Sequence, residues 1–168
     1  FDTSRAGKAY RIILSMGLLD EAQQEIPPLR LATLEELHRF HHPAYLEAIQ
    51  RAERGDLDDE TLMMGLGTAD CPLFRGMFDY ASQVAAVSID GAQLLLDGMT
   101  DTVFNPWGGL HHAHPAQASG FCYLNDVVMA VQTLVEAGKR VLFLDVDAHH
   151  GDGVQNAFYD NGQVMTIS

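Results

Sequence analysis

Side chains that could bind a metal ion or move a proton gather in the segment DVDAHHGDG, residues 145–153. It follows the apolar run VLFL, and alternation along an extended strand end would put Asp145, Asp147 and His149 on one face. Carboxylate and imidazole groups at this spacing suit zinc or another borderline divalent ion. Carboxylates buried at the end of an apolar strand need a partner or a metal, because isolated burial costs several kcal/mol. We therefore predict a metal site in this segment.

Two other interpretations of the segment were weighed. Its residues could be ordinary polar groups at a strand end that cap nearby helices. A calcium loop of the EF-hand type would need Gly at its sixth position and Glu at its twelfth, where His150 and Asn156 stand. It would also need a preceding helix, whereas VLFL has the pattern of a strand, so the calcium interpretation is excluded.

A second group of reactive side chains lies in GGLHHAHPAQASGFCYLND, residues 108–126. His111 and His112 are adjacent imidazoles in a Gly-flanked loop, with an ordinary pKa of about 6.5 that suits proton transfer at neutral pH. Asp145 and Asp152 are the natural partners to fix their tautomers. The sequence thus predicts two His–Asp pairs.

These residues need elements to position them, and the apolar periodicity indicates helices and short strands in alternation. Thr33 with Glu36 forms a capping-box signature for a helix start, and Pro43 is tolerated in the first turn of the next helix. The expected helices are Arg5–Leu19, one from Thr33, Pro43–Arg51, Leu73–Leu96 and Asp126–Ala137. The expected strands are 102–104, 141–144 and 164–167, and residues 29–32 are a short extended piece. Residues 54–72 look irregular.

Short, wholly apolar strands between helices indicate an α/β domain with a parallel sheet buried on both faces. In such sheets function gathers in the loops beyond the carboxyl ends of the strands. Asp145 follows one strand, and His111 and His112 follow the strand near Phe104, so both reactive groups should lie at that edge.

Composition limits the classes of function. A net charge of −13 argues against a nucleic-acid surface, although it could attract cationic substrates such as lysine-rich tails or polyamines. No apolar run reaches the roughly 20 residues of a membrane span, and no signal-peptide pattern is present, so a cytoplasmic location is expected. Cys71 and Cys122 are expected to be free, buried thiols. No linker or repeat divides the 168 residues, which indicates one domain.

The segments NPWGGLHHAHPAQASGFCYLNDVVMA and VLFLDVDAHHGDGVQNAFYD resemble signature blocks of the histone deacetylase family. The resemblance is strongest to the class I enzymes and to bacterial relatives of the acetoin-utilisation type. Residues 34–50 and 65–82 also resemble that family's N-terminal segments, in family order. The resemblance implies a three-layer, parallel-sheet fold of the arginase/deacetylase type, with residues 1–168 as the N-terminal part of a single catalytic domain.

The same resemblance implies a role for each reactive side chain. Asp147 and His149 resemble two of the family's three protein ligands to zinc, a set that in principle also accepts ferrous iron. His112 with Asp152 resembles the general base that activates water and then protonates the leaving amine. His111 with Asp145 resembles the second imidazole, whose role is more electrostatic.

Further residues have implied roles in binding. Gly120 and Phe121 resemble the walls of the tunnel that admits an acetylated lysine side chain, and Asp70 resembles the carboxylate at its rim. A bound K⁺ or Na⁺ is also implied, held by main-chain carbonyls and one hydroxyl. By position these belong to Asp145, Asp147, His149, Phe158, Asn161, Val164 and the Ser168 side chain.

The family's third zinc ligand and its oxyanion-stabilising Tyr are expected beyond Ser168, so the 168 residues are expected to bind zinc weakly and to be inactive alone. The implied activity of the parent protein is zinc-dependent hydrolysis of acetyl-lysine amides in proteins. Three alternatives stay open: an acetylpolyamine amidohydrolase acting on acetylated small amines, a non-catalytic scaffold of the same fold, and an arginase-like two-metal hydrolase.

Overall fold

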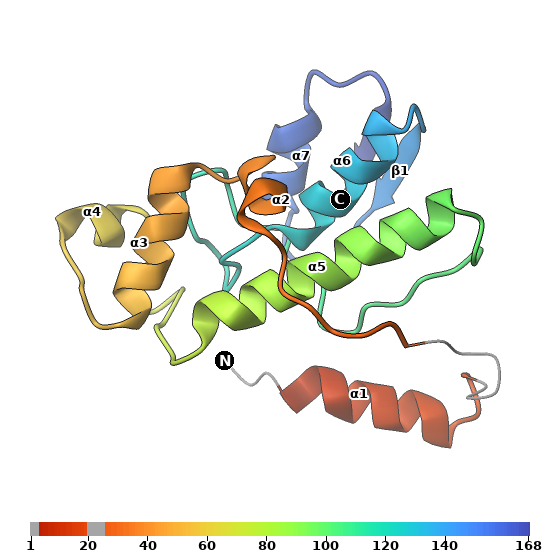
Figure 1. The fold of residues 1–168 in the computed structure, drawn as a ribbon, viewed down its shortest axis with the longest axis horizontal. Helices are drawn as coiled ribbons and strands as arrows, with labels where there is room; N and C mark the ends of the chain where they lie inside the picture. Colours follow the sequence, from red (N-terminus) through yellow and green to blue (C-terminus); the bar gives the residue numbers. More distant parts are fainter. Residues whose placement is uncertain (1–3, 20–25) are drawn as a thin grey trace.

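The computed structural model describes residues 4–19 and 26–168 and arranges most of them around one long helix, α5 (Figure 1). The helices are α1 (Ser4–Ser15), α2 (Leu34–His38), α3 (Pro43–Glu53), α4 (Asp59–Met63), α5 (Met77–Leu96), α6 (Asp126–Glu136) and α7 (Asp152–Phe158), and the strands are β1 (Val141–Leu144) and β2 (Val164–Ile167). Within the described ranges, no helix is both long and apolar enough to cross a membrane.

The first helix is shorter than its apolar pattern predicted. α1 ends at Ser15, not at Leu19, and none of its residues is buried. Ile12 and Met16, two members of the predicted apolar face, are exposed. An apolar stripe predicts a helix because it can be buried, yet here Ile12 and Met16 stay exposed and Ile13 and Leu19 are only half-buried.

Two short helices, α2 and α4, begin where side chains satisfy their first backbone N–H groups. The Thr33 hydroxyl accepts the N–H of Glu36, whose carboxylate accepts the N–H of Thr33, so the predicted capping box is confirmed. α3 begins at Pro43, as predicted. The expectation that residues 54–72 are irregular was wrong in part, because Asp58 and Thr61 form a reciprocal cap that starts α4. A cap without an apolar run behind it is a weak signal in a sequence.

The central helix begins four residues later than expected, at Met77 and not at Leu73. Gly76 precedes it with φ of 79°, a left-handed conformation that glycine adopts at little cost. The Glu53 carboxylate at the end of α3 accepts the N–H groups of Gly76 and Phe78, at 2.7 and 3.0 Å. These bonds satisfy amides that a helix start leaves without partners.

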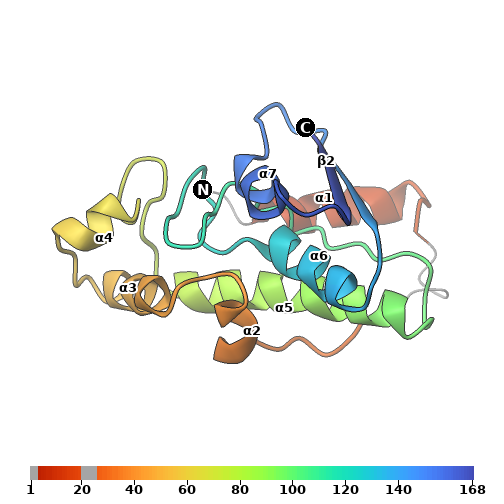
Figure 2. The same cartoon turned by 90° about the horizontal axis from the view of Figure 1, so that it is seen from above.

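The sheet is parallel, as predicted, with Val141 of β1 opposite Val164 of β2. In Figure 2, α6 lies between α5 and the strands, which gives the order α5, α6, sheet. One apolar cluster joins α6 and α7 to the inner face of the sheet, and its members include Val128, Val131, Val154, Phe158, Val141, Phe143 and Val164. A larger cluster fills the space between α2, α3, α5, α6 and the loop before α6.

The expectation that the sheet is buried on both faces was wrong for the described residues. Leu144 and Met165 are each 61% exposed, and Leu142 and Ile167 share that outer face. Side chains alternate along each strand, and α6 and α7 cover only the face that carries Val141 and the other inner residues.

The predicted strand at 102–104 does not form, and this segment packs along α5 instead. A Cβ built on Gly91 of α5 would lie 2.5 Å from Cγ1 of Val103, so the valine packs where the helix has no side chain. Residues 29–32 are extended, as predicted, but they also bond to α5, where the Ala32 N–H donates to the Ser82 carbonyl. Helix α5 thus packs against the segment that was expected to be a strand and also bonds to the extended piece at residues 29–32.

Candidate active site beyond the end of β1

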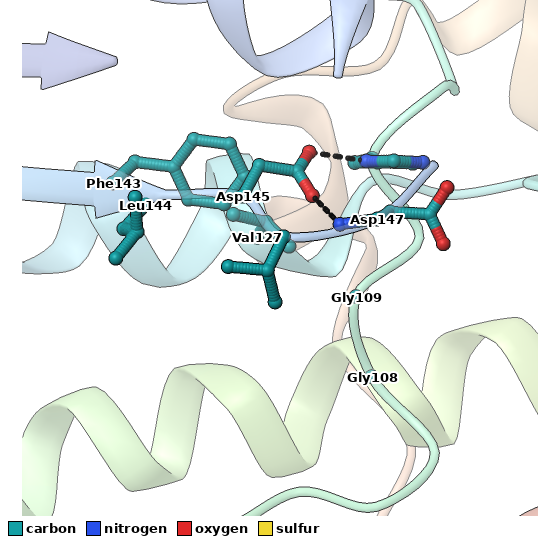
Figure 3. Close-up of a pocket in the computed structure, with 9 residues that line it drawn as sticks. Gly108, Gly109, Val127, Phe143, Leu144, Asp145 and Asp147 are labelled. Carbon is teal, nitrogen blue, oxygen red and sulfur yellow. Dashed lines mark hydrogen bonds and ion pairs between the residues drawn. The ribbon is translucent and has the colours of Figure 1, made fainter. Parts of the chain in front are cut away.

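Asp145 is the first residue after β1, and its carboxylate connects two parts of the chain. Its Oδ2 lies 2.6 Å from Nδ1 of His111, in the loop before α6. Its Oδ1 accepts the backbone N–H of Asp147 at 3.0 Å. Figure 3 shows both interactions as dashed lines at the end of β1, beyond Phe143 and Leu144. The strand end and the histidine loop therefore meet, as the sequence predicted.

The second pair lies beside the first. Nδ1 of His112 is 2.8 Å from Oδ1 of Asp152, the first residue of α7. The rings of His111 and His112, which we name the histidine pair, have centroids 4.1 Å apart. His114, which the sequence analysis did not single out, places Nε2 3.4 Å from the other oxygen of Asp152. The Asp152 carboxylate thus contacts two imidazoles of the same loop.

Both carboxylates of these pairs are held in the ionised form. Burial would raise the pKa of Asp145, but the N–H of Asp147 and the His111 imidazole together hold this pKa below its ordinary value. Burial likewise acts against the His112 imidazole at Asp152, and the pKa again lies below the ordinary value. An ionised carboxylate at Nδ1 keeps a proton on that nitrogen, so Nε2 of each ring is the atom that can exchange a proton.

Asp147 and His149 adopt a geometry that the sequence analysis missed. Oδ1 of Asp147 accepts the N–H of His149 at 2.8 Å and lies 3.1 Å from its Nδ1. Each carboxylate thus accepts the backbone N–H group two residues ahead, so the segment bends and is not the extended strand end that was expected. The expectation of a carboxylate buried at the strand end was also wrong for this pair, because the side chains of Asp147 and His149 are 53% and 79% exposed.

The donor atoms of Asp147 and His149 fit a shared divalent ion. Two neighbouring ligands of a tetrahedral zinc ion, with bonds of about 2.0–2.1 Å, lie about 3.3 Å apart. The 3.1 Å between Oδ1 of Asp147 and Nδ1 of His149 is close to that spacing. The His149 ring centroid is 6.1 Å from that of His112, so this pair lies beside the histidine pair. Among residues 4–19 and 26–168, no group of three or more such ligands gathers.

Gly120 lies directly against the His112 ring. A Cβ at this position would be 2.3 Å from Cδ2 of the imidazole, so only glycine allows this approach. Gly120 and Phe121 both have positive φ, at 53° and 63°. The Asp70 side chain accepts the N–H of Gly120 at 2.6 Å, and its carbonyl accepts that of Phe121 at 3.2 Å. The three residues with predicted roles in substrate binding therefore form one connected, partly exposed turn beside His112.

The residues with implied monovalent-cation roles lie around α7 and β2, and several of their oxygens already accept hydrogen bonds. Oγ of Ser168 accepts the Gly151 N–H at 2.9 Å. The Phe158 carbonyl accepts the N–H of Asn161, and the Asn161 carbonyl accepts that of Val164. A carbonyl oxygen has a second lone pair, so these bonds leave room for an ion.

Three buried polar residues behind the histidine loop were not singled out from the sequence: His41, Asn125 and Asp126. Asn125 is the N-cap of α6 and Asp126 is its first residue. The pattern of an Asn before an apolar helix could have identified the cap. Nothing in the local sequence indicates that His41 reaches the same place from 84 residues away.

A cavity of about 430 Å³ opens on the Asp145 side of the histidine pair. It is lined by Gly108, Gly109, His111, Val127, Phe143, Leu144, Asp145, Val146 and Asp147. Its wall joins the strand end, the glycines before the histidines and the first turn of α6 (Figure 3).

Comparisons with known proteins identify one family to which the chain is similar. The chain matches the family model described as "Histone deacetylase domain" over residues 1–168. It is 44% identical to Histone deacetylase 8 of Xenopus tropicalis, over 98% of this chain and 44% of that protein. It is 40% identical to Histone deacetylase RPD3 of Saccharomyces cerevisiae, over 98% of this chain and 38% of that protein. The chain therefore spans less than half the length of these relatives.

Solved structures give the same result for the fold. The crystal structure of an HDAC homologue from Aquifex aeolicus superposes with a TM-score of 0.79 and 37% identity, over 94% of this chain and 42% of that one. A structure of an HDAC homologue complexed with SAHA matches equally well. The predicted α/β fold of the arginase/deacetylase type is confirmed.

Proposed function

The chain belongs to the histone deacetylase family, and from that premise we propose that it forms the N-terminal part of a metal-dependent amidohydrolase that removes acetyl groups from lysine side chains of proteins. The observation that carries the proposal is the convergence of two His–Asp pairs on the Asp147–His149 pair. The relatives are named as histone deacetylases, and each is more than twice as long as the matched segment. The activity is therefore proposed for a protein of that length that carries these residues.

Asp147 and His149 would hold the metal ion, which we propose to be zinc, with ferrous iron as the alternative that the same donors accept. When bound, zinc would polarise the amide carbonyl and lower the pKa of water towards about 7. The protein's contribution is to hold Oδ1 of Asp147 and Nδ1 of His149 about one ligand spacing apart.

His112 carries out the proton transfers. With Nδ1 engaged by Asp152 at 2.8 Å, Nε2 takes a proton from the attacking water and later gives it to the leaving amine. Such a positioned imidazole contributes typically about 10²–10⁴-fold to the rate. Gly120 against the ring fixes its plane, because no side chain separates the turn from the imidazole.

His111 has an electrostatic role in this proposal. Its ring and the Asp145 carboxylate are almost fully shielded from solvent, and they form the shorter of the two pairs, at 2.6 Å. The Asp145 carboxylate accepts the proton on Nδ1 of His111 and leaves Nε2 facing the site. Nε2 of His111 would then stabilise the negative oxygen that forms when water adds to the amide.

Gly120, Phe121 and Asp70 would receive the acetylated side chain. The Phe121 ring is exposed at a turn whose backbone Asp70 holds through two hydrogen bonds. An apolar ring and a side-chain-free glycine suit a narrow passage for a methylene chain, and a carboxylate at its edge can accept substrate N–H groups.

We also propose K⁺ or Na⁺ binding at the carbonyls around α7 and Ser168, and a cytoplasmic location.

A second candidate, hydrolysis of acetylated polyamines, is favoured by one observation. The net charge of −13 would attract a small cation from any direction. The two functions differ in whether the substrate needs a peptide backbone.

Turnover by the zinc-loaded full-length protein tests both candidates. An acetyl-lysine peptide should be hydrolysed with a kcat/KM at least tenfold above that of acetylspermidine, and the reverse order would favour the polyamine. Hydrolysis of neither would leave a non-catalytic scaffold. We further propose that residues 1–168 alone hydrolyse neither, because the family's third ligand and its Tyr are expected outside them. Turnover by the 168-residue chain would contradict that proposal.

A further inference from the structure

Two consecutive residues at the start of α6 hold the histidine loop on both sides of the histidine pair. Before the pair, the Asp126 carboxylate accepts the N–H groups of Gly109 and Leu110, with the shortest bond at 2.8 Å to Leu110. After the pair, Nδ2 of Asn125 donates to the Ala113 carbonyl at 2.9 Å. The backbone that carries both imidazoles is thus fastened at two points to one rigid helix end.

The Asn125 side chain has only one orientation that satisfies its neighbours. Its Oδ1 accepts the Val128 N–H at 3.0 Å and caps α6, while Nδ2 faces the Ala113 carbonyl. Exchanging the oxygen and nitrogen would place two donors together at Val128 and two acceptors together at Ala113. Asn125 is fully buried, so water cannot compensate for either conflict.

His41 fixes the backbone of the same asparagine. Its Nε2 accepts the Asn125 N–H at 3.0 Å, which requires an unprotonated Nε2. Only 1% of His41 is exposed, and burial lowers its pKa to about 4, so the ring is neutral at pH 7. The rings of Phe40 and Tyr45 pack against it and restrict its rotation.

Asp126 has a matching connection to α5. Ser88 donates its hydroxyl to Oδ2 of Asp126 at 2.6 Å and accepts Nδ2 of Asn105 at 2.9 Å. Burial raises the pKa of Asp126, and the hydrogen bonds from Ser88, Leu110 and Gly109 act in the opposite direction. The Asp126 side of the loop is therefore tied to the longest helix of the fold.

Asp152, the partner of His112, lies next to the part of the histidine loop that Asn125 holds. Gly153 follows Asp152, and a Cβ on it would lie 2.6 Å from the carbonyl oxygens of His111 and Ala113. It would also lie 2.9 Å from Nδ2 of Asn125. The start of α7 therefore packs against the histidine loop. The distance between His112 and Asp152 thus depends on the position in which Asn125 holds this loop.

We infer that Asn125 and Asp126 are positioning residues for the histidine pair, and that His41 is the fixed acceptor that orients Asn125. Asn125 and Asp126, which we name the clamp, act on the imidazoles through the backbone of residues 109–113 and contact no reacting atom. The importance of the clamp for catalysis rests on the proposed function, whereas its effect on ring geometry does not.

Asn125→Ser is the most informative variant. Serine keeps an acceptor for the Val128 N–H at the N-cap, but its side chain is too short to reach the Ala113 carbonyl. Thr33→Ala is the matched control, because it removes the cap of α2 and leaves the histidine loop untouched. Asp126→Asn tests the other side of the clamp, because a neutral amide replaces the carboxylate that accepts the N–H groups of Gly109 and Leu110.

The expected result appears in three measurements. In ¹⁵N NMR spectra, the ring nitrogens of His112 shift in Asn125→Ser and not in Thr33→Ala. Amide exchange at Leu110 becomes faster by on the order of tenfold in Asp126→Asn, as expected when a bond to a buried carboxylate weakens. In the full-length protein, Asn125→Ser lowers kcat for the acetyl-lysine peptide by about tenfold to a hundredfold with little change in KM. Displacement of a catalytic group by about 1 Å costs up to about a hundredfold in rate.

Unchanged His112 signals in a folded Asn125→Ser variant would overturn the inference. If the variants do not fold, the wild-type protein decides: Leu110, which lies in a loop, should exchange as slowly as the amides of α6, and His41 should carry its proton on Nδ1. Rapid exchange at Leu110 or a proton on Nε2 of His41 would overturn it. Inactivity of the full-length wild type would reject the proposed function alone, because the NMR and exchange results need no turnover.

Discussion

Replacing Gly120 with alanine should displace the His112 imidazole, and the size of the effect can be worked out from two contacts. The new Cβ would lie 2.3 Å from Cδ2 and 2.8 Å from Cγ of His112. Carbon atoms in contact are ordinarily about 3.5–4.0 Å apart, so the ring has to move by about 1.2 Å or more. The 2.8 Å bond from His112 to Asp152 would then lengthen beyond hydrogen-bond range.

Two costs add in the free energy of unfolding. Gly120 has φ of 53°, and a left-handed conformation costs alanine about 1–2 kcal/mol. The lost bond to an ionised carboxylate costs about 1.5–3 kcal/mol more. Gly138→Ala is the matched control, because Gly138 also has positive φ, at 76°, and nothing lies within 4 Å of its built Cβ. The control should therefore show only the first cost.

Urea unfolding of both variants measures the difference, and ¹⁵N NMR of His112 shows whether the ring moved. In the full-length protein, Gly120→Ala should reduce kcat by about 10²-fold or more, the range expected for a displaced general base. Equal stabilities for the two variants, together with unchanged His112 ring signals, would refute this account of the turn.

The remaining predictions concern pH and the substrate rim. Burial lowers the pKa of His41 from 6.5 to about 4, so the stability that depends on its neutral form is complete above pH 6.5 and falls by up to about 3 kcal/mol as the pH drops towards 4. His41→Gln should remove this dependence in urea titrations, whereas the exposed His42→Gln should not. The hydrogen bond from Arg30 lowers the pKa of Glu36 from 4.5 to about 2, so its contribution is present above pH 4.5 and is lost towards pH 2. Glu36→Gln should destabilise the protein at pH 7 by about 1–2 kcal/mol in thermal unfolding and reduce its loss of stability in acid, and an equal effect of the exposed neighbour Glu35→Gln would contradict this assignment. Asp70→Ala should raise KM for the acetyl-lysine peptide more than it lowers kcat, because Asp70 holds the turn at the proposed rim, and an unchanged KM would argue against that role.

The His–Asp pairs could be predicted from the sequence because the physics that joins them is simple. A loop with two adjacent imidazoles and a strand that ends in carboxylates are brought together by the packing of α6 against β1. The glycine at position 120 could be assigned to the site only by resemblance, because its contact with His112 depends on a turn held by Asp70.

Other features could not be predicted because they depend on competing local bonds or distant contacts. Alternation along an extended strand put Asp147 and His149 in a buried row, yet their backbone N–H groups bond to carboxylates two residues earlier and bend the chain outward. Val103 has strand character, but a glycine on α5 offers it a better contact. His41 reaches Asn125 across 84 residues, which no local pattern reveals.

The most direct test of the central claim is the rate of acetyl-lysine peptide hydrolysis by the zinc-loaded full-length protein with His112→Ala. We expect kcat to fall by about 10²-fold or more, because we propose that Nε2 of His112 moves the proton. The control His150→Ala alters an exposed imidazole of the same segment and should retain nearly all activity. A near-normal rate for His112→Ala would contradict the claim that the His112–Asp152 pair is the general base.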